Sequence, residues 1–402
     1  MDVIAIPKYV KNVMKQLGSA GFSAYLVGGC VRDMLMGKMP HDWDVCTDAL
    51  PQEVMDLFPK ALPTGLKHGT VTVRQGEGHV EVTTFRSDGK YADHRRPERV
   101  SFISDLKEDL QRRDFTVNAM AMSLSGEVID PFEGRKDIAG RLIRCVGDPR
   151  ERFQEDALRM FRALRFSACL GFDVQEATFS AICEMSHLAS FLAAERVREE
   201  LEKILMSSSP HILGQVIETG LMDSYLTGPG KPVPELRGLG GLPINKQQRW
   251  AAFCAALERE GLILTSEDFL RKLRLSNSEI RNCGEGAALA LGNPPAGRLG
   301  WKRLLAAKGV EIAQCAAAAA DLLYSGNSQE TLSEVINSGE CFSMKQLAVT
   351  GDDLLALGFA GIELGDALRW LLDHVLRFPE DNNREQLLYL ASRMGQEPYS
   401  FI

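Results

Sequence analysis

The stretch that determines the predicted fold is Tyr25-Leu-Val-Gly-Gly-Cys-Val-Arg-Asp33, followed shortly by His41-Asp-Trp-Asp-Val45. In the first stretch an apolar strand runs into Gly28 and Gly29 and then into a helical pattern. Such a turn aims unpaired backbone N–H groups and the positive end of a helix dipole at an anion, and a triphosphate suits it. Because two glycines after a strand more often form a plain tight turn, the phosphate site is predicted only together with its surroundings.

Three carboxylate residues occur in strand patterns that follow the glycine turn in the sequence. Side chains alternate along a strand, so we expect Asp42 and Asp44 to project from one face, with Trp43 between them on the other. Glu81 lies in an apolar alternating run, where a buried carboxylate needs a counter-charge. The simpler alternative to a functional site is that Asp42 and Asp44 form the solvated acidic end of a strand. Hard oxygen ligands suit Mg²⁺, so we predict a metal site at Asp42 and Asp44, completed by Glu81.

These three carboxylates beside a phosphate-binding turn indicate a reaction class. In the two-metal scheme one ion lowers the pKa of an attacking 3′-hydroxyl, and the other stabilises the leaving pyrophosphate. The predicted chemistry is therefore nucleotidyl transfer.

The rest of the chain divides by its hydrophobic pattern. Up to about residue 145, short alternating runs predict strands at 24–27, 42–47, 70–74 and 80–85. Beyond Gly147 helical patterns predominate, at 150–170, 195–206, 266–273, 304–323 and 365–375. The predicted fold class is α+β, with a small mixed sheet in an N-terminal head followed by all-helical parts.

The composition of the chain argues against several classes of protein. The chain has 402 residues, of which 45% are hydrophobic, and a formal net charge of -8, so local patches rather than overall charge must make any RNA contact. Nine scattered cysteines without a CxxC pair predict reduced thiols rather than disulfides or a zinc site. The N-terminus lacks a signal-peptide pattern and no long apolar run occurs, so we expect a cytoplasmic protein without membrane contact.

Longer motifs resemble those of a known family. The two opening stretches look like the head motif of the polymerase β-type nucleotidyltransferases, in the branch of class II tRNA nucleotidyltransferases and bacterial poly(A) polymerases. Four more motifs follow in the family's order: the second motif at 112–119, the head-to-neck hinge at 130–137, the base-selecting motif at 155–159 and the neck motif at 195–201. Weaker similarity to the Gram-positive type of CCA-adding enzyme continues at 269–276 and 351–356.

The resemblance implies a domain plan and an activity. The parts are a catalytic head at 1–145, a base-selecting helical neck at 146–207, a helical body at 208–300 and a tRNA-binding helical tail at 301–402. The implied activity is template-independent, Mg²⁺-dependent addition of C, C and A from CTP and ATP to the 3′ end of tRNA, with release of pyrophosphate.

The resemblance also implies residue roles. It assigns base reading to Asp156 and Arg159, and it places Gly29 and Arg32 near the phosphates and ribose. Three more arginines complete the nucleotide contacts: Arg113, Arg162 and Arg165.

Base chemistry supports this reading of the neck. Cytosine and adenine offer an amino donor beside a ring-nitrogen acceptor, which a carboxylate and a guanidinium match, whereas uracil and guanine offer a carbonyl and a ring N–H. We predict that one neck helix carries Asp156, Arg159, Arg162 and Arg165 at three-residue spacing. Without the other motifs, such a row is more often a salt-bridged surface.

Contacts with the tRNA body are less specific. Residues 231–304 hold 12 Lys or Arg against 7 Asp or Glu, which fits a tRNA-binding flank and a solvated helix face equally well. Nothing in the sequence specifies an oligomeric state.

Three alternatives stand beside this interpretation. A poly(A) polymerase shares the head but is expected to have a basic C-terminal extension, whereas residues 350–402 hold 4 Arg, no Lys and 9 Asp or Glu. An enzyme that adds only CC would lack the flexible loop that residues 86–97 resemble, and an A-only enzyme stays open. We predict that the loop at 86–105 acts as a lever between C and A addition. A catalytically inactive RNA-binding protein would have no reason to keep the three carboxylates together.

Overall fold

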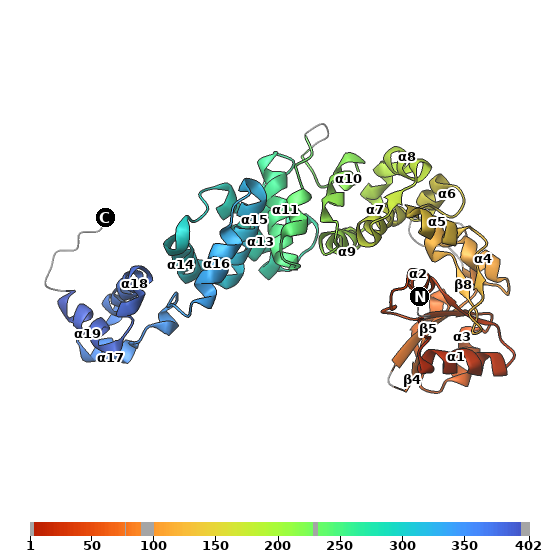
Figure 1. Cartoon of the computed structure of the whole chain (residues 1–402), viewed down its shortest axis with the longest axis horizontal. Coiled ribbons are helices and arrows are strands. Elements are labelled where there is room, and N and C mark those ends of the chain that lie inside the picture. The colour runs from red at the N-terminus through yellow and green to blue at the C-terminus, as the bar shows by residue number, and fades with distance from the viewer. Residues whose placement is uncertain (1–3, 77, 90–99, 228–231, 395–402) are drawn as a thin grey trace. The chain divides into compact units, whose positions relative to one another are not determined.

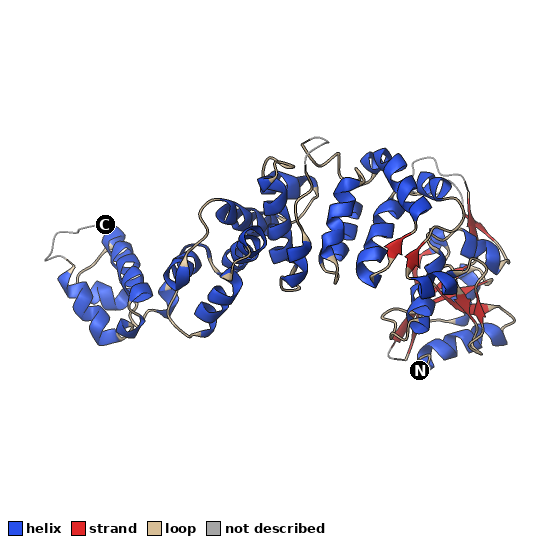
Figure 2. Cartoon of the chain, turned by 45° about the horizontal axis from the view of Figure 1, so that its top comes forward, coloured by secondary structure: helices blue, strands red, loops and turns tan. Residues whose placement is uncertain are grey.

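The computed structural model describes residues 4–76, 78–89, 100–227 and 232–394 (Figure 1). The chain forms two compact units, Met1–Ser224 and Tyr225–Ile402. Within the described residues every strand lies in the first unit, and the second unit is helical (Figure 2). The α+β fold class is confirmed. None of the described helices combines the length and the apolar character that a membrane crossing requires.

One mixed sheet forms the centre of the N-terminal part. Its described strands lie in the order β3-β4-β5-β2-β1-β8-β9, and β2 and β5 pair in parallel. The bounds are β1 Ala24–Val27, β2 Asp44–Thr47, β3 Leu62–Gly65, β4 Thr70–Gln75, β5 Gly78–Thr84, β8 Ala121–Met122 and β9 Val128–Ile129. The four predicted strands are confirmed, except that the strand predicted from residue 42 begins at Asp44, because Asp42 lies in an exposed bend before the ladder to β5 begins.

Helices cover both faces of this sheet. The helices of this part are α1 Lys8–Ser19, α2 Gly29–Leu35, α3 Pro51–Leu57 and α4 Leu106–Gln111. Apolar residues of α1 and α3 pack with Trp43 and Val45 on one face. Leu110 of α4 packs with Cys46 on the other face. Because side chains alternate along β2, Asp44 shares the face of Cys46.

The remainder of the first unit is mainly helical. Two short ladders join β6 Arg86–Asp88 to β7 Val100–Phe102, and β10 Leu142–Ile143 to β11 Asp173–Val174. The helices are α5 Gly134–Gly140, α6 Pro149–Glu155, α7 Leu158–Leu170, α8 Glu176–Met185, α9 Ala194–Leu205 and α10 Leu213–Glu218. Residues 90–99, the centre of the loop predicted to act as a lever, lie outside the described residues.

The single helix predicted at 150–170 was wrong in one respect. The chain breaks between α6 and α7, because Asp156 adopts an extended conformation (φ −138°, ψ 104°). Its Oδ1 accepts a hydrogen bond from the backbone N–H of Leu158 at 3.1 Å, which satisfies a donor in the first turn of α7. Asp156 therefore stands before the helix that carries Arg159, Arg162 and Arg165, not on it.

The described part of the second unit is built from α-helices and short connections. The helices are α11 Lys246–Arg259, α12 Ser266–Lys272, α13 Asn277–Leu291, α14 Gly297–Lys308, α15 Val310–Tyr324, α16 Ser328–Asn337, α17 Gly351–Ala356, α18 Gly361–Arg377 and α19 Arg384–Arg393. The predicted helix at 304–323 spans parts of α14 and α15, because Gly309 at φ +84° separates them. The four-part division at residues 145, 207 and 300 stays a prediction. All nine cysteines are free, and Cys169 and Cys183 are the two that are exposed.

Candidate active site

The glycine turn predicted to bind phosphate lies beside Asp44. Gly28 has φ +77° and ψ −134°, which residues with a Cβ rarely adopt, and it directly precedes α2. A Cβ built at Gly28 would lie 3.3 Å from Nη1 of Arg113 and 3.9 Å from Oδ2 of Asp44. A Cβ at Gly29 would lie 3.7 Å from Nη2 of Arg32. The turn thus brings bare backbone close to one carboxylate and two guanidiniums.

We expect Gly28→Ala to impair both folding and nucleotide binding. The alanine strains the backbone at this positive φ, which lowers the free energy of unfolding by about 1–3 kcal/mol. Its methyl group also meets the Arg113 guanidinium, so the KM for CTP should rise. Urea unfolding and steady-state kinetics measure these effects. Gly18→Ala in α1 is the control, because no atom lies within 4 Å of its Cβ. A Gly28→Ala protein with the wild-type stability and KM would contradict the assigned turn.

Three carboxylates interact at this edge of the sheet. Asp44 begins β2 and pairs in register with Glu81 of β5, while Asp42 lies in the preceding bend. Burial, then the charge of Glu81, raises the pKa of the Asp44 carboxyl to about 6 against the opposing effect of Arg113, and Asp42 adds to the rise. The expectation that Glu81 is buried was wrong: the valines on either side of it fill the core, so Glu81 itself is exposed.

Because the pKa of Asp44 is raised, we predict that Asp44→Asn increases the free energy of unfolding of the metal-free protein, and that this increase depends on pH. The folded-state pKa lies above the unfolded one, so the wild-type carboxylate destabilises the fold above pH 6, and this penalty disappears as the pH falls toward 3.8. In the presence of EDTA, the Asp44→Asn variant should have a free energy of unfolding at pH 8 that is roughly 1–3 kcal/mol higher than that of the wild type. At pH 5 the gain should be smaller. Urea titrations at both pH values test this, and an equal gain at both would contradict it.

A buried carboxylate orients Arg113 toward this site. The Asp109 side chain in α4 accepts hydrogen bonds from Nη2 of Arg113 at 3.2 Å, from Arg112 at 2.8 and 3.0 Å, and from the backbone N–H of Arg86 at 3.2 Å. Burial opposes ionisation of Asp109, but Arg113 and Arg112 hold its pKa below the ordinary value. Nε of Arg113 is buried and has no hydrogen-bond partner among the described residues. Arg113 therefore places Nη1 beside the Gly28 turn and keeps a buried Nε donor without an acceptor among the described residues.

The carboxylates fit a cation that also binds a phosphate. Within the described ranges, no three His, Cys, Asp or Glu side chains are arranged to hold a metal ion by themselves. Mg²⁺ at phosphate-transfer sites is usually held by one or two carboxylates together with substrate phosphates. The clustered charge around Asp44 and the adjacent glycine turn have this chemistry.

The predicted base-reading pair is engaged by other groups. Arg196 of α9 binds Asp156, with Nη2 at 3.0 Å from Oδ2 and Nη1 at 3.4 Å from Oδ1. Arg159 is buried, and its Nη1 donates to Glu155 at 2.5 Å. Arg159 also donates to the main-chain carbonyl of Arg112 at 3.1 Å, which ties it to the segment that carries Arg113.

The other predicted arginines gather around the same part of the first unit. Arg162 pairs with Asp114, and Arg165 pairs with Glu200, each at 2.5 Å. Arg32 pairs with Asp33 at 2.7 Å and donates to Asn118 at 2.8 Å. The sequence interpretation gave no role to Arg196 or Asp109. The spacing of Asp109 three and four residues before two arginines could have revealed it, whereas the contact of Arg196 with Asp156 spans 40 residues.

Family models and curated relatives match nearly the whole chain. The models for the poly A polymerase head domain, the probable RNA and SrmB-binding site of polymerase A, and the putative tRNA nucleotidyltransferase domain 2 match residues 24–144, 171–230 and 243–391. A CCA-adding enzyme of Geobacillus kaustophilus is 40% identical over 391 residues, which covers 94% of each chain. The chain belongs to the CCA-adding enzyme family. It is a nucleotidyltransferase, and nucleotidyltransferases of this family are generally metal-dependent.

Other members of the CCA-adding enzyme family are similar over the same extent. An Enterococcus faecalis member is 35% identical over 416 residues, and the match covers 98% of both chains. The crystal structure of the Bacillus stearothermophilus CCA-adding enzyme in complex with CTP superposes with a TM-score of 0.79 at 33% identity, and it covers 97% of both chains. The resemblance inferred from the motifs is confirmed.

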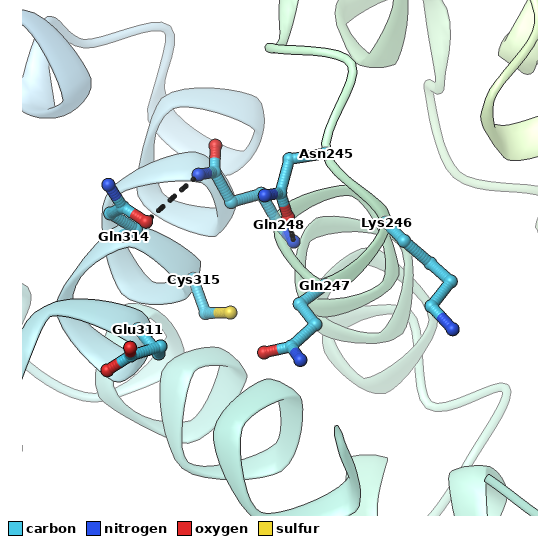
Figure 3. A pocket seen from close by; sticks show the side chains of 7 residues that line it. All are labelled: Asn245, Lys246, Gln247, Gln248, Glu311, Gln314 and Cys315. Carbon is cyan, nitrogen blue, oxygen red and sulfur yellow. Dashed lines mark hydrogen bonds between the residues drawn. The ribbon is translucent and has the colours of Figure 1, made fainter. Parts of the chain in front are cut away.

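A separate pocket lies in the second unit (Figure 3). It has a volume of about 260 Å³, and a hydrogen bond of 3.4 Å joins Gln248 to Gln314 at its wall. Its lining residues are Asn245, Lys246, Gln247, Gln248, Glu311, Gln314 and Cys315. None of the predicted site residues contributes to it.

Proposed function

We propose that this chain adds C, C and A in turn to the 3′ end of tRNA, takes the nucleotides from CTP and ATP, and uses Mg²⁺ held by Asp42 and Asp44 in the cytoplasm. The observation that carries the proposal is the placement of Asp44 and Arg113 beside the Gly28 turn, where a side-chain atom of each lies within 4 Å of the position that a Cβ on Gly28 would take. Membership of the CCA-adding enzyme family supports the substrates and the order of addition.

The catalytic residues act through charge and position. A bound divalent cation supplies positive charge that favours the ionised 3′-hydroxyl and the departing pyrophosphate. Asp42 and Asp44 fix the cation at the start of β2, and Glu81 adds negative charge to the site from β5. Arg113, whose Nη1 lies beside the Gly28 turn, would donate to a phosphate oxygen bound there, and its buried, unpaired Nε provides a further donor for the substrate.

Asp156 and Arg159 read the base. A carboxylate has roughly four acceptor positions, and three donors, the N–H of Leu158 and two N–H groups of Arg196, already bind Asp156. The remaining position accepts the exocyclic amino group that cytosine and adenine share. Arg159 donates to the adjacent ring nitrogen. Uracil and guanine are rejected, because they present a carbonyl where Asp156 requires a donor.

The four-part plan remains part of this proposal. The head at 1–145 performs the chemistry, the neck at 146–207 reads the base, and the body at 208–300 and tail at 301–402 bind tRNA. The local basic excess at residues 231–304 supports an RNA-binding surface on an otherwise acidic chain.

Product analysis distinguishes the proposed function from its rivals. We expect purified protein with CTP, ATP and Mg²⁺ to extend tRNA that ends at the discriminator base by three nucleotides, and sequencing should read CCA. A long A tail would instead indicate a poly(A) polymerase. An A-only enzyme would leave this substrate unchanged, and an inactive RNA-binding protein would extend no tRNA end. EDTA should stop addition and Mg²⁺ should restore it.

A further inference from the structure

Three guanidiniums of the proposed nucleotide site lie around one aromatic ring. Cζ of Arg165 is 3.8 Å from the centroid of the Phe166 ring, and Cζ of Arg162 and of Arg32 are 5.4 and 5.5 Å from it. Arg32 lies on α2, whereas the other three residues lie on α7. The ring therefore contacts cations from two separate elements of the first unit.

The carboxylate partners of these arginines are all different. Arg32 pairs with Asp33, Arg162 with Asp114, and Arg165 with Glu200. An ion pair restrains one edge of a guanidinium, but these three pairs do not restrain the guanidiniums relative to one another. Contact with a single ring does, because its electron-rich face attracts each cation and its bulk limits where each plane can lie.

The Phe166 ring is itself fixed in place. It is 8% exposed and meets the ring of Phe115 edge to face, with centroids 5.7 Å apart and an interplanar angle of 78°. Phe115 is fully buried and directly follows Asp114, the partner of Arg162. The Phe166 ring on α7 is thus anchored against the segment that also carries Arg113.

We propose that Phe166 is a positioning residue that holds Arg32, Arg162 and Arg165 in one arrangement toward the anionic part of the nucleotide. The inference rests on the proposed function, in which these arginines bind CTP and ATP. The ring acts on the phosphate and ribose contacts that both nucleotides share, and its ring contacts within the described residues are with Phe115 and the three arginines. Its loss should therefore weaken both nucleotides equally and leave base choice unchanged.

The test compares Phe166→Leu with Phe161→Leu. Phe161 is also buried on α7, and no guanidinium of the described residues lies over its ring, so its replacement removes the same atoms without removing a cation–ring contact. We expect Phe166→Leu to raise the KM for CTP on tRNA without CCA, and the KM for ATP on tRNA ending in CC, by about tenfold each. The kcat should stay within about threefold, and Phe161→Leu should leave both KM values near wild type. Phe166→Tyr, which keeps the ring, should restore them.

Each outcome has a defined meaning. Equal KM values for Phe166→Leu and Phe161→Leu would overturn the positioning role, as would a change for one nucleotide only or a fall in kcat at unchanged KM. If Phe166→Leu does not unfold cooperatively, Phe166→Met takes its place with the same expected result. Failure of the wild-type protein to add CCA would instead overturn the proposed function.

Discussion

Asp44→Asn and, separately, Asp42→Asn are expected to reduce the incorporation of both C and A by at least about 10³-fold while the protein stays folded. The substitution removes the charge of a proposed metal ligand but keeps the volume of the side chain. Neither residue stabilises the core: Asp42 is exposed, and burial and neighbouring charges already oppose ionisation of Asp44. Single-turnover addition of labelled CTP and ATP, together with urea unfolding, measures both parts of the expectation.

Asp48→Asn is the matched control for these variants. Asp48 follows the same strand, and its Oδ1 accepts the backbone N–H of Ser23 at 2.8 Å, which an amide oxygen can replace. We expect this variant to add CCA at close to the wild-type rate. Wild-type rates for Asp42→Asn or Asp44→Asn with Mg²⁺ would show that the metal site lies elsewhere.

Asp156→Asn and Arg159→Ala are expected to relax base choice. A site built to pair with a polar group rejects mismatched analogues strongly, so discrimination against UTP and GTP should fall by about 10²-fold or more, with a smaller loss of rate on CTP. Asn is the informative replacement at Asp156, because its oxygen can still accept the N–H of Leu158 while its amide group can donate to the carbonyl of uracil. Competition assays with all four nucleotides measure the change.

Arg150→Ala controls for the loss of a neck arginine. Arg150 lies on α6 and forms an exposed pair with Glu184, which should contribute little to stability. This variant should retain the wild-type preference for CTP and ATP. If Asp156→Asn and Arg159→Ala retain it as well, the base is read by other residues.

The sheet and the glycine turn could be predicted because their signals are local. Alternation over a few residues specified β1, β4 and β5, and the step from an apolar run to Gly28 specified the turn. The break at Asp156 was missed, because the apolar periodicity continues across it. An aspartate that accepts a nearby backbone N–H stands before the first turn of a helix more readily than inside one, and this capping preference could have been weighed against the period.

The environments of the site residues depend on contacts distant in sequence. Glu81 is exposed although it pairs in register with Asp44, because the valines on either side of it fill the core, and a pattern of apolar neighbours does not reveal how far the opposite face is covered. The pairing of Arg196 with Asp156 joins α9 to the end of α6. The contact between the Arg32 guanidinium and the Phe166 ring joins α2 to α7. Residue types and motif order led to the proposed site residues, whereas the partners of these side chains could be identified only from the tertiary structure.

The most direct test of the central claim measures single-nucleotide addition to three tRNA ends. Purified protein with Mg²⁺ would be given tRNA ending at the discriminator base, at -C or at -CC, with one of the four nucleotides in each reaction. We predict that CTP extends the first two ends, that ATP extends the -CC end, and that UTP and GTP extend none. Efficient use of UTP or GTP by the wild-type protein, or addition of A to the discriminator end in preference to C, would contradict the account.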